Sequence, residues 1–422
     1  MTLLSRITLT LKRSLPAPVI SAYHFFVAIA GALLYGFPSR DLIVVGVTGT
    51  KGKSSTVEMI GAIAEAHGWK VALLDSIRVR IGAAERPNTM RMSMPGRFYL
   101  QRFLRQATES GCTIAIIEMT SEGARQHRHR GIALDALVFT NLAPEHIESH
   151  GSYEKYVAAK WELGRQLLRS SKRPRIMVAN GDDAVGARFL TLPVEAVLPY
   201  SLAGIPHSAN EKGGSFSYGG EEISIALPGD FSLKNALAAA TVCHALGIPV
   251  HDIARGLASI TRIPGRAERI EAGQNFSVVV DYAHTPDSLQ ALYDAYANRR
   301  LICVLGSTGG GRDTWKRPVM GKIAAQMCDA VILTNEDPYD EDPSSIIAQI
   351  AKGMEGIKTP EIILDRRAAI ARALSLARPG DAVLITGKGT DPTIQGPRGT
   401  SIPWSDATVA REELAKLEQQ YT

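Results

Sequence analysis

The stretch GVTGTKGKSSTVEM at residues 46–59 constrains the fold most, because it joins an apolar strand to a helix through a glycine-rich turn. A turn of this kind ending in Lys-Ser is typical of a nucleotide phosphate site, since its N–H groups and the helix N-terminus bind anions. The standard loop, G-x-x-x-x-G-K-[ST], would place glycine where Val47 stands here. A tight turn without a ligand is the alternative, and the flanking strand, the helix and GKS argue against it.

Strand and helix patterns alternate from Asp41 onward, which predicts an α/β fold with a mostly parallel sheet covered on both faces. Strands are expected at 41–49, 71–76, 113–119 and 136–140, and helices at 53–68, 96–111, 153–168 and 230–247. The glycine-rich, alternating residues 200–228 predict antiparallel hairpins.

The segment TRIPGRAER at residues 261–269 is the predicted domain boundary. Beyond it, strand-then-loop patterns restart at 277–286, 301–306, 330–338 and 382–389. We therefore predict an apolar N-terminal helix segment (1–40), a central P-loop ATPase-like domain (41–263) and a Rossmann-like α/β C-terminal domain (264–422).

Composition excludes several classes of protein. The chain has 422 residues, 45% hydrophobic and 21% charged, as in ordinary globular proteins. A net charge of +5 with dispersed basic residues does not indicate nucleic-acid binding, although an anionic substrate or a nearby membrane remain open. The four cysteines form no CxxC pair, which argues against a zinc ribbon or a disulfide framework and suits a reducing cytosol; they are Cys112, Cys243, Cys303 and Cys328.

The first forty residues contain four basic residues and no Asp or Glu. Residues 19–37 are apolar and long enough to span a bilayer. Only a few residues separate this segment from the next strand, and export would place an ATP site outside the cytosol. Ala28, Ala32 and Gly36 share one helical face that suits close packing. We expect a helix docked on the protein or lying at the membrane surface; a true span ranks second and a signal peptide last.

Further polar motifs follow strands, where open sheets of this type bind ligands. Glu118 ends a strand beside the glycine-rich turn, a natural position for a carboxylate that orients a metal. TNLAPEHIESHGSYEKYVAAKWELG, at 140–164, holds His146 and Lys160, and VVDYAHTP holds Asp281 and His284. A basic glycine loop (305–318), an acidic turn (334–343) and ITGKGTDP (385–392) complete the set. Singly, each could be a solvated loop or a helix cap.

In this order, the motifs resemble those of Mur ligases, and most closely those of UDP-N-acetylmuramoyl-tripeptide synthetases, which add the third residue of the peptidoglycan stem peptide. The resemblance covers residues 41–422 and rests on GTKGKSS, TNLAPEHIESHG followed by AAK, PGR, VDYAHTP, GGGRDTWKRPVMG, the acidic turn and GKG. It also resolves the loop spacing, because Mur ligases carry G-T-x-G-K-[ST]-[ST].

The resemblance implies ATP-dependent amide ligation with Mg²⁺. A substrate carboxylate attacks the γ-phosphate, an acyl phosphate forms, and an amine displaces phosphate. It implies catalytic roles for Lys53, Glu118, His146 and Lys160, with Ser54, Glu118 and His146 as metal ligands; Lys160 matches a lysine that is carbamylated in the family. The remaining implied nucleotide-binding residues are Gly49, Thr50, Gly52, Ser55, Asn235, Arg266, Asp281 and His284, and Lys53 and Ser54 belong to this group too. The implied substrate residues are Arg312, Lys316, Asp337, Tyr339, Lys388 and Asp391.

Three departures from the family pattern matter. Residues 1–40 are too few for the family's N-terminal UDP-binding domain, so another protein could replace it, or the acceptor could be lipid-linked. Enzymes that select meso-diaminopimelate carry D-N-P-R, where this chain has E-D-P-Y. Tyr339 therefore stands in place of the arginine that would clamp the distal carboxylate of that amino acid. G-K-G-H-E reads G-K-G-T-D, ending at Asp391.

The sequence therefore predicts a cytoplasmic ATP-dependent ligase that joins a free amino acid to a muropeptide-like carboxylate acceptor and binds no nucleic acid. Peripheral membrane contact through residues 16–38, at the inner face of the membrane, accompanies this prediction. A ligase acting on a lipid-linked or non-peptidoglycan acceptor, and a nucleotide-binding subunit without catalysis, remain the alternatives.

Overall fold

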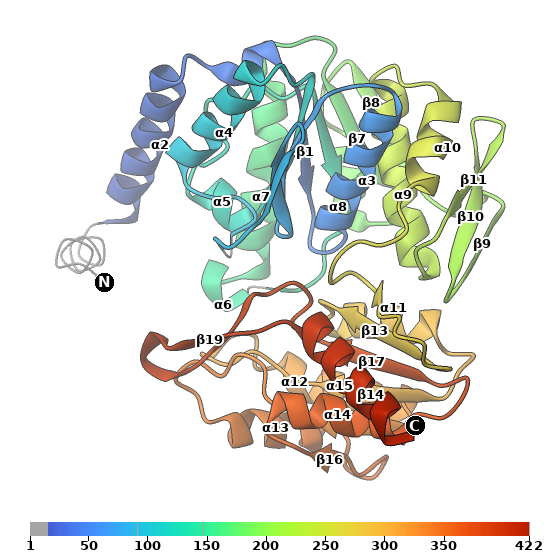
Figure 1. Cartoon of the computed structure of the whole chain (residues 1–422). Coiled ribbons are helices and arrows are strands. Elements are labelled where there is room, and N and C mark those ends of the chain that lie inside the picture. The colour runs from blue at the N-terminus through green and yellow to red at the C-terminus, as the bar shows by residue number, and fades with distance from the viewer. Residues whose placement is uncertain (1–15, 91, 146, 422) are drawn as a thin grey trace. The chain divides into compact units, whose positions relative to one another are not determined.

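The computed structural model of the protein describes residues 16–90, 92–145 and 147–421, which divide into two compact units (Figure 1). The first unit comprises the described residues up to Leu142 together with Glu154–Ser201 and Leu237–Gly256. The second comprises Ala143–Tyr153, Leu202–Ala236 and the chain from Leu257 onward. The ranges 41–263 and 264–422 remain our proposal for the two domains.

The first unit is built on an eight-stranded sheet of order β4-β3-β2-β5-β1-β6-β7-β8. Six neighbouring strands, from β2 to β8 in that order, run parallel, whereas β3 and β4 pair antiparallel at one edge. The strands are β1 (Ile43–Thr48), β2 (Val71–Leu74), β3 (Arg78–Ile81), β4 (Ala84–Pro87), β5 (Ile114–Glu118), β6 (Ala136–Phe139), β7 (Ile176–Asn180) and β8 (Ala196–Tyr200). The mostly parallel sheet is as predicted, and the β3–β4 hairpin is an addition to it.

Helices and short turns connect these strands, and α3 packs against β1, β2 and β5. They are α2 (Ala17–Leu34), η1 (Pro38–Asp41), α3 (Lys53–Ala66), α4 (Arg97–Glu109), α5 (Ser121–Arg125), α7 (Tyr153–Leu168), α8 (Ala184–Phe189), α9 (Gly229–Ala245) and α10 (Val250–Ala258); α9 passes from the second unit into the first. The predicted helices over 53–68, 96–111, 153–168 and 230–247 are confirmed, with small shifts at their ends.

The order of the strands explains why a ligand site forms after β1. From β1, the chain crosses to β2 on one side of the sheet, and later strands β6, β7 and β8 extend the other side. The loop after β1 therefore lies where the strand order changes direction, at the carboxyl ends of the strands, which is the usual ligand position in such sheets. The apolar strand residues behind it, such as Val44 and Phe139, are fully buried.

The second unit contains a six-stranded sheet of order β12-β13-β17-β14-β15-β16, parallel except for β12. Its strands are β12 (Glu268–Arg269), β13 (Ser277–Asp281), β14 (Leu301–Leu305), β15 (Ala330–Leu333), β16 (Glu361–Ile362) and β17 (Ala382–Thr386). Alternate residues of each central strand enter two separate cores: Val279 and Leu384 enter one, Val278 and Val383 the other. Both faces are thus buried, as parallel sheets require.

The helices of this unit are α6 (Ile147–His150), α11 (Pro286–Ala295), α12 (Lys316–Met327), α13 (Pro343–Lys352), α14 (Arg366–Leu376) and α15 (Asp406–Tyr421), with a short turn η2 (Pro397–Gly399). The predicted hairpins form an antiparallel sheet of order β11-β10-β9, made of β9 (His207–Asn210), β10 (Gly213–Tyr218) and β11 (Glu221–Ile225). A further hairpin pairs β18 (Thr393–Gln395) with β19 (Ser401–Pro403).

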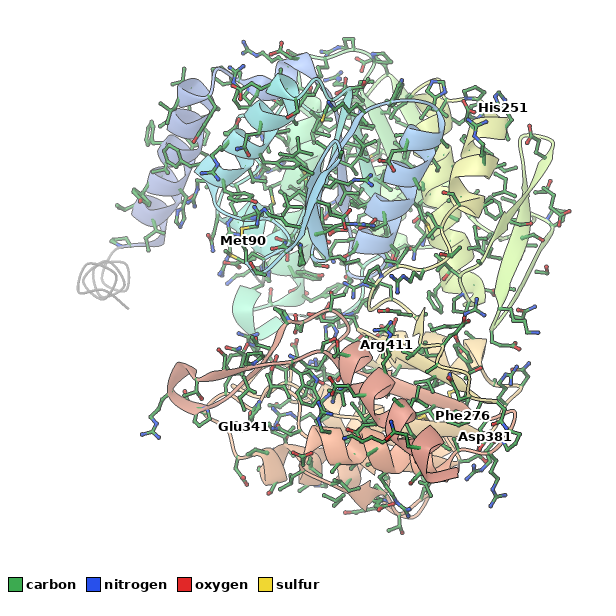
Figure 2. The ribbon with its side chains drawn as sticks, in the orientation of Figure 1. Met90, His251, Phe276, Glu341, Asp381 and Arg411 are labelled. Atoms are coloured by element: carbon green, nitrogen blue, oxygen red, sulfur yellow. A yellow bond between two sulfur atoms is a disulfide. The ribbon has the colours of Figure 1, made fainter. Side chains whose placement is uncertain are left out.

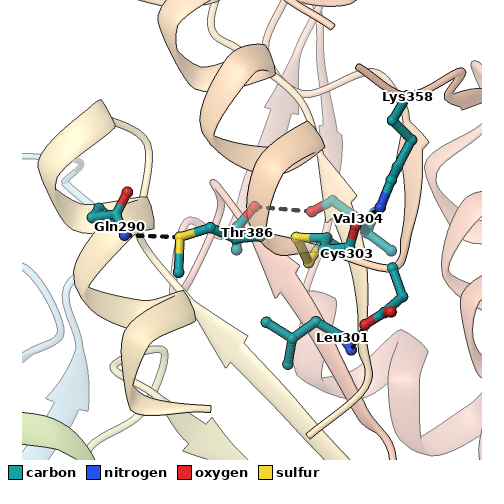
Figure 3. Close-up of a disulfide and its surroundings, with 9 residues drawn as sticks. Gln290, Leu301, Cys303, Val304, Lys358 and Thr386 are labelled. Atoms are coloured by element: carbon teal, nitrogen blue, oxygen red, sulfur yellow. Dashed lines mark hydrogen bonds between the residues drawn. A yellow bond between two sulfur atoms is a disulfide. The ribbon is translucent and has the colours of Figure 1, made fainter. Parts of the chain in front are cut away.

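One disulfide crosses the second unit and corrects the expectation for the cysteines. Cys303 on β14 bonds to Cys328, which directly follows α12 (Figure 3). Cys112 and Cys243 are free and buried. The argument from spacing against disulfides is therefore wrong for this pair. A separation of 25 residues carries no recognisable signal, because the fold alone brings the end of α12 beside β14.

Helix α2 packs along α4 at the edge of the first unit (Figure 1). Ala28 and Ala32 are buried, as the spacing of small residues predicts, and Gly131 approaches Ala32 so closely that a Cβ there would lie 2.5 Å from the Cβ of Ala32. Among the described residues, none of the helices is long and apolar enough to cross a membrane.

Candidate active site

The turn between β1 and α3 can form only with glycine at two positions. Gly49 has φ of 148°, and a Cβ there would lie 1.9 Å from the hydroxyl oxygen of Thr140. Gly52, the N-cap of α3, has φ of 79°, in the left-handed region. The N–H of Thr50 donates to the carbonyl of Asn141 at 2.8 Å, which holds the turn against the loop after β6. The N-terminus of the 14-residue helix α3 follows at once, as in anion sites.

Three side chains meet behind this turn: Lys53, Ser54 and Glu118. The Lys53 ammonium donates to the carbonyl of Thr50 at 2.8 Å and lies 3.9 Å from Glu118 Oε1. The Ser54 hydroxyl donates to Glu118 Oε2 at 2.7 Å and lies 2.8 Å from the hydroxyl of Ser76. Hydroxyl and carboxylate oxygens are ligands that Mg²⁺ prefers, so this donor set fits a magnesium ion beside a bound phosphate.

Asp75, at the end of β2, adds a buried carboxyl to this edge. Its Oδ1 accepts from the N–H groups of Ile77 and Arg78 at 2.7 and 2.8 Å, while Oδ2 has no partner among the described residues. Burial raises the pKa of Asp75 well above its ordinary value, and the nearby Glu58 and Glu118 raise it further. Arg78 pairs with Glu58 and Lys53 lies 3.9 Å from Glu118, whereas Asp75 has no ion pair among the described residues, which favours an added cation.

Lys160, on α7, reaches the same turn from the other side. Its ammonium is buried and donates to the carbonyl of Gly49 at 2.5 Å, and it lies 5.0 Å from the ring centroid of Tyr156. The Tyr156 hydroxyl lies 2.9 Å from the Thr50 hydroxyl. Two residues one helical turn apart on α7 thus contact the phosphate loop.

His146 lies outside the described residues, so its predicted metal role stays a prediction. Across residues 16–90, 92–145 and 147–421, no three or more His, Cys, Asp or Glu side chains group together in a way that could hold a metal ion. A magnesium ion at Ser54 and Glu118 would therefore need oxygens from a nucleotide or from water, as is usual for this ion.

A second group of predicted residues lies at the end of β13 in the second unit. Asp281 accepts from the N–H groups of Ala267 and Ala283, at 2.5 and 2.6 Å, and so ties the PGR turn to this strand. His284 Nδ1 lies 2.7 Å from the carbonyl of Tyr282, and its Nε2 lies 2.7 Å from Glu145 Oε1. Both ring nitrogens of His284 thus have partners, which fixes its orientation.

Arg266 and Asn235 belong to the same unit. The Arg266 guanidinium stacks 4.7 Å from the ring centroid of Tyr282 and donates to the carbonyl of Gly265 at 3.0 Å. Asn235, on α9, is 8% exposed.

The predicted substrate residues of the second unit cluster beyond β14, β15 and β17. Lys388 is fully buried, and its ammonium donates to both carboxylate oxygens of Asp337 at 2.9 Å and to Asp391 at 3.3 Å. Tyr339 has a φ of 53°. The Arg312 guanidinium stacks on the Tyr339 ring, 4.9 Å from the ring centroid. The charge of Lys388 is thus matched within the protein.

Three buried side chains at this edge were not among the predicted residues. Glu336 accepts from the Thr308 hydroxyl at 2.7 Å, its other oxygen has no partner among the described residues, and burial raises its pKa. Arg366 donates to Asp406 at 2.7 and 2.8 Å. Lys316, which was predicted, is 5% exposed.

The third buried residue that was not predicted is Arg317, which directly follows Lys316. It is fully buried and donates to both carboxylate oxygens of Glu341, at 2.5 and 2.9 Å; Glu341 is labelled in Figure 2. Hydrogen bonding from Arg317 lowers the pKa of Glu341. This pair joins the first turn of α12 to the acidic turn.

Comparisons with known proteins show the family of this chain. Residues 47–243 match the Mur ligase middle domain and residues 265–389 match the Mur ligase, glutamate ligase domain. A UDP-N-acetylmuramyl-tripeptide synthetase of Roseiflexus sp. (strain RS-1) is 39% identical over 95% of this chain and 84% of its own length. A UDP-N-acetylmuramoyl-L-alanyl-D-glutamate–2,6-diaminopimelate ligase of Geobacillus kaustophilus (strain HTA426) is 34% identical over the same shares. The chain belongs to the Mur ligase family.

Solved structures support the same fold. A UDP-N-acetylmuramoyl-L-alanyl-D-glutamate–2,6-diaminopimelate ligase superposes with a TM-score of 0.61 at 28% identity, over 89% of this chain and 79% of that one. A Mycobacterium tuberculosis folylpolyglutamate synthase reaches 0.68 at 17% identity, over 86% and 92%, which shows a shared fold alone. Mur ligases are ATP-dependent amide ligases that add amino acids to peptidoglycan precursors, and this chain is an enzyme of that type.

The sequence of this Mur ligase located most of the buried polar residues described here, and it missed a few. Lys53, Ser54 and Glu118 meet at one turn, and Lys160 reaches the same turn although 111 residues separate it from Gly49. Asp75 was missed, yet it directly follows a buried strand, which is the signal that identified Glu118. Glu336 and Arg317 lie inside motifs that were recognised, but their burial has no sequence signal.

Proposed function

We propose that this Mur ligase uses ATP to join a free amino acid to the carboxylate of a muropeptide-like acceptor, through an acyl phosphate. The observation that carries the proposal is the arrangement around the phosphate loop: Lys53 and Lys160 donate to carbonyls of one glycine turn, and Ser54, just after this turn, donates to Glu118. The acceptor carboxylate attacks the γ-phosphate and ADP leaves. The amino group then attacks the acyl carbon, loses a proton, and phosphate leaves as the amide bond forms.

In this proposal the chain's own residues hold the phosphates and offset their charge. The N–H groups from Gly52 to Ser55 and the Lys53 ammonium bind the β- and γ-phosphates, while Thr50 is held by Tyr156. Ser54 and Glu118 would hold Mg²⁺, with His146 as a third proposed ligand; the ion supplies positive charge to the transferring phosphoryl group.

Lys160 supports either of two roles at the turn. As an ammonium ion it would help to bind phosphate; if carbamylated, as the matching lysine is in this family, it would present an anion. The hydrogen bond to the carbonyl of Gly49 fits the uncarbamylated side chain. For the second unit we propose that four residues bind the nucleotide: Asn235, Arg266, Asp281 and His284. Hydrogen bonds hold the Asp281 carboxylate and the His284 ring in place, which supports this proposal.

We further propose that the added amino acid lacks the distal carboxylate of diaminopimelate. Tyr339 replaces the arginine that would clamp that group, and Arg312 stacks on the Tyr339 ring. Asp337 and Asp391 both accept hydrogen bonds from the buried Lys388 ammonium, so this lysine is not available to a carboxylate of the substrate. We expect Arg312, Lys316, Asp337, Tyr339 and Asp391 to contribute to the amino-acid site through the shape and charge of their loops.

The test is ATP-dependent phosphate release across a panel of amino acids, with UDP-linked and lipid-linked muropeptides as acceptors. We expect release only when acceptor and amino acid are both present, with a neutral or basic amino acid preferred over diaminopimelate. Diaminopimelate as the best substrate would overturn the specificity proposal, and release without an acceptor would overturn the ligase proposal. We place the enzyme in the cytoplasm, where ATP is available, at the inner face of the membrane; a partner protein that binds the acceptor nucleotide also fits this proposal.

A further inference from the structure

The outer face of α2 exposes large apolar side chains in one stripe. The 18-residue helix contains no charged residue, and its most exposed apolar side chains are Val19, Tyr23, Phe26, Leu33 and Leu34, between 48% and 70% accessible. Positions 19, 23, 26, 30 and 33 recur at helical spacing, so they lie along one side. Such a continuous apolar face on the surface marks a binding surface rather than ordinary scatter.

The inner face of the same helix is anchored, so the stripe is held facing outward. Ala28 and Ala32 are buried, and the Ser21 hydroxyl lies 2.7 Å from His127 Nε2. At the C-terminal end of the helix, Arg105 donates twice to the carbonyl of Tyr35, at 2.6 and 3.0 Å. Figure 1 shows α2 lying against α4, with its other side turned away from the sheet of this unit.

Phe98 widens the stripe from the neighbouring helix. It lies on α4, is 43% exposed, and its ring would be 3.6 Å from a Cβ placed on Gly31 of α2. The apolar surface therefore continues from α2 onto α4 and is not confined to one helix.

Arginines border this apolar surface. Arg97, next to Phe98, donates to the carbonyl of Gln126, and Arg40 stacks 4.5 Å from the ring centroid of Phe37, just beyond α2. Arg130 lies 5.8 Å from the ring centroid of Phe25 on the helix. Burial lowers the pKa of the Arg97 and Arg130 guanidinium groups, and neighbouring arginines lower it further.

The acidic groups at this border are too few to neutralise it. Glu162 is shared by Arg130, Arg165 and Arg169, and Glu122 pairs with Arg125. The surface is thus apolar in its centre and positively charged at its border.

We propose that this surface binds an anionic lipid membrane. Its apolar side chains would enter the boundary between headgroups and acyl chains while the arginines bind lipid phosphates, as interfacial helices do. A second copy of the chain fits less well, because pairing two such surfaces would bring two arginine borders together. The proposed function places the enzyme at the inner face of the membrane, and this proposal names the surface that binds there. It does not depend on the ligase chemistry.

The test is sedimentation of the full-length chain with vesicles, without ATP or substrates. We expect binding at least tenfold stronger to vesicles of equal phosphatidylcholine and phosphatidylglycerol than to phosphatidylcholine alone, and weakening of it as salt rises. The double variant Phe26→Asp/Leu34→Asp should lose at least tenfold of this binding. The matched control Ile362→Asp/Ile402→Asp changes two similarly exposed side chains of the second unit, 56% and 63% accessible, and should bind as the wild type does.

A second variant guards against a helix that no longer packs. Leu33→Trp keeps an apolar side chain, and its fluorescence should shift to the blue and be quenched by brominated lipids on anionic vesicles only, relative to the wild type. Equal binding to both kinds of vesicle, unchanged binding by the double variant, or no quenching at position 33 would each overturn the proposal. Dimerisation through the stripe without vesicle binding would overturn it in favour of a protein interface.

Discussion

The carboxylates at the phosphate-loop edge of the first unit and those at the carboxyl edge of the second are similarly buried but differently neutralised. Near the loop, Glu118 has Lys53 only at 3.9 Å, and one oxygen of Asp75 has no partner among the described residues. In the second unit, Lys388 lies 2.9 Å from both oxygens of Asp337. The first edge therefore lacks positive charge that a ligand would bring, whereas the second carries its own.

This difference separates groups that act on a ligand from groups that hold the protein together. A buried ion pair whose partners satisfy each other contributes to the local structure, and removing one partner leaves an uncompensated charge. A cation facing a site with few partners is available for chemistry. Substitutions at the two edges should consequently affect different measurements.

The largest effect is expected at the phosphate loop. Lys53→Ala should lower ATP-dependent ligation by about 10³-fold or more, because the ammonium offsets charge on the transferring phosphoryl group. Unfolding by urea should change little, since Lys53 makes one hydrogen bond to a loop carbonyl. Phosphate release measures the first and circular dichroism the second. Lys212→Ala, at an exposed lysine, is the control, and turnover of Lys53→Ala within tenfold of the wild type would contradict the assigned role.

The reverse pattern is expected at Lys388. Lys388→Met should lower the free energy of unfolding by about 3–5 kcal/mol, because Asp337 would remain buried without its partner. Lys416→Met removes an exposed lysine paired with Glu413 and should cost less than about 1 kcal/mol. Urea unfolding of both variants measures the difference. If Lys388→Met were as stable as the control, the buried pair would not hold the loop as the comparison requires.

Ligand binding at the phosphate-loop edge of the first unit should stabilise the folded chain. ADP with Mg²⁺ at a hundred times its Kd should raise the free energy of unfolding by about 2.7 kcal/mol if it binds only the folded chain. Glu118→Gln should lose the part of this gain that depends on Mg²⁺, because it removes an anionic ligand oxygen. Thermal unfolding with ADP alone and with ADP and Mg²⁺ separates the two parts. Glu361→Gln, at a half-exposed carboxylate, should keep both, and an equal Mg²⁺-dependent gain in Glu118→Gln would refute the metal assignment.

The smallest effect concerns pH at the second edge. Burial raises the pKa of Glu336 above its ordinary value of 4.5, so the folded chain keeps this proton to higher pH than the unfolded chain does. The contribution of Glu336 to the free energy of unfolding is therefore complete below about pH 4.5. It falls as the pH rises through the pKa of the folded state, by at most about 1.4 kcal/mol per pH unit. Glu336→Gln should remove that fall, so its unfolding midpoint should rise relative to the wild type between pH 4.5 and 8. Parallel curves would show that Glu336 does not titrate in this range.

Local patterns predicted most of the elements that build the sites. The runs of β-branched residues before 48, 118 and 281 are strands, and the glycine spacing at 49–52 forms the turn it predicts. The hairpin at 78–87 was missed because its strands are short and polar, so their alternation is too weak to stand out. The α2 helix was recognised from its apolar run, and its docking by Ala28 and Ala32 follows from the small-residue spacing.

The sequence by itself determined the α/β class, the phosphate loop and the resemblance to Mur ligases, because these depend on short patterns that physics ties to local structure. Only the tertiary structure decided which charges are satisfied. Lys53 and Lys388 look alike in a motif, yet one lies 16% exposed at the loop and the other is fully buried between carboxylates. The disulfide between Cys303 and Cys328 belongs to the same class of fact, since burial and pairing depend on residues far apart in the chain.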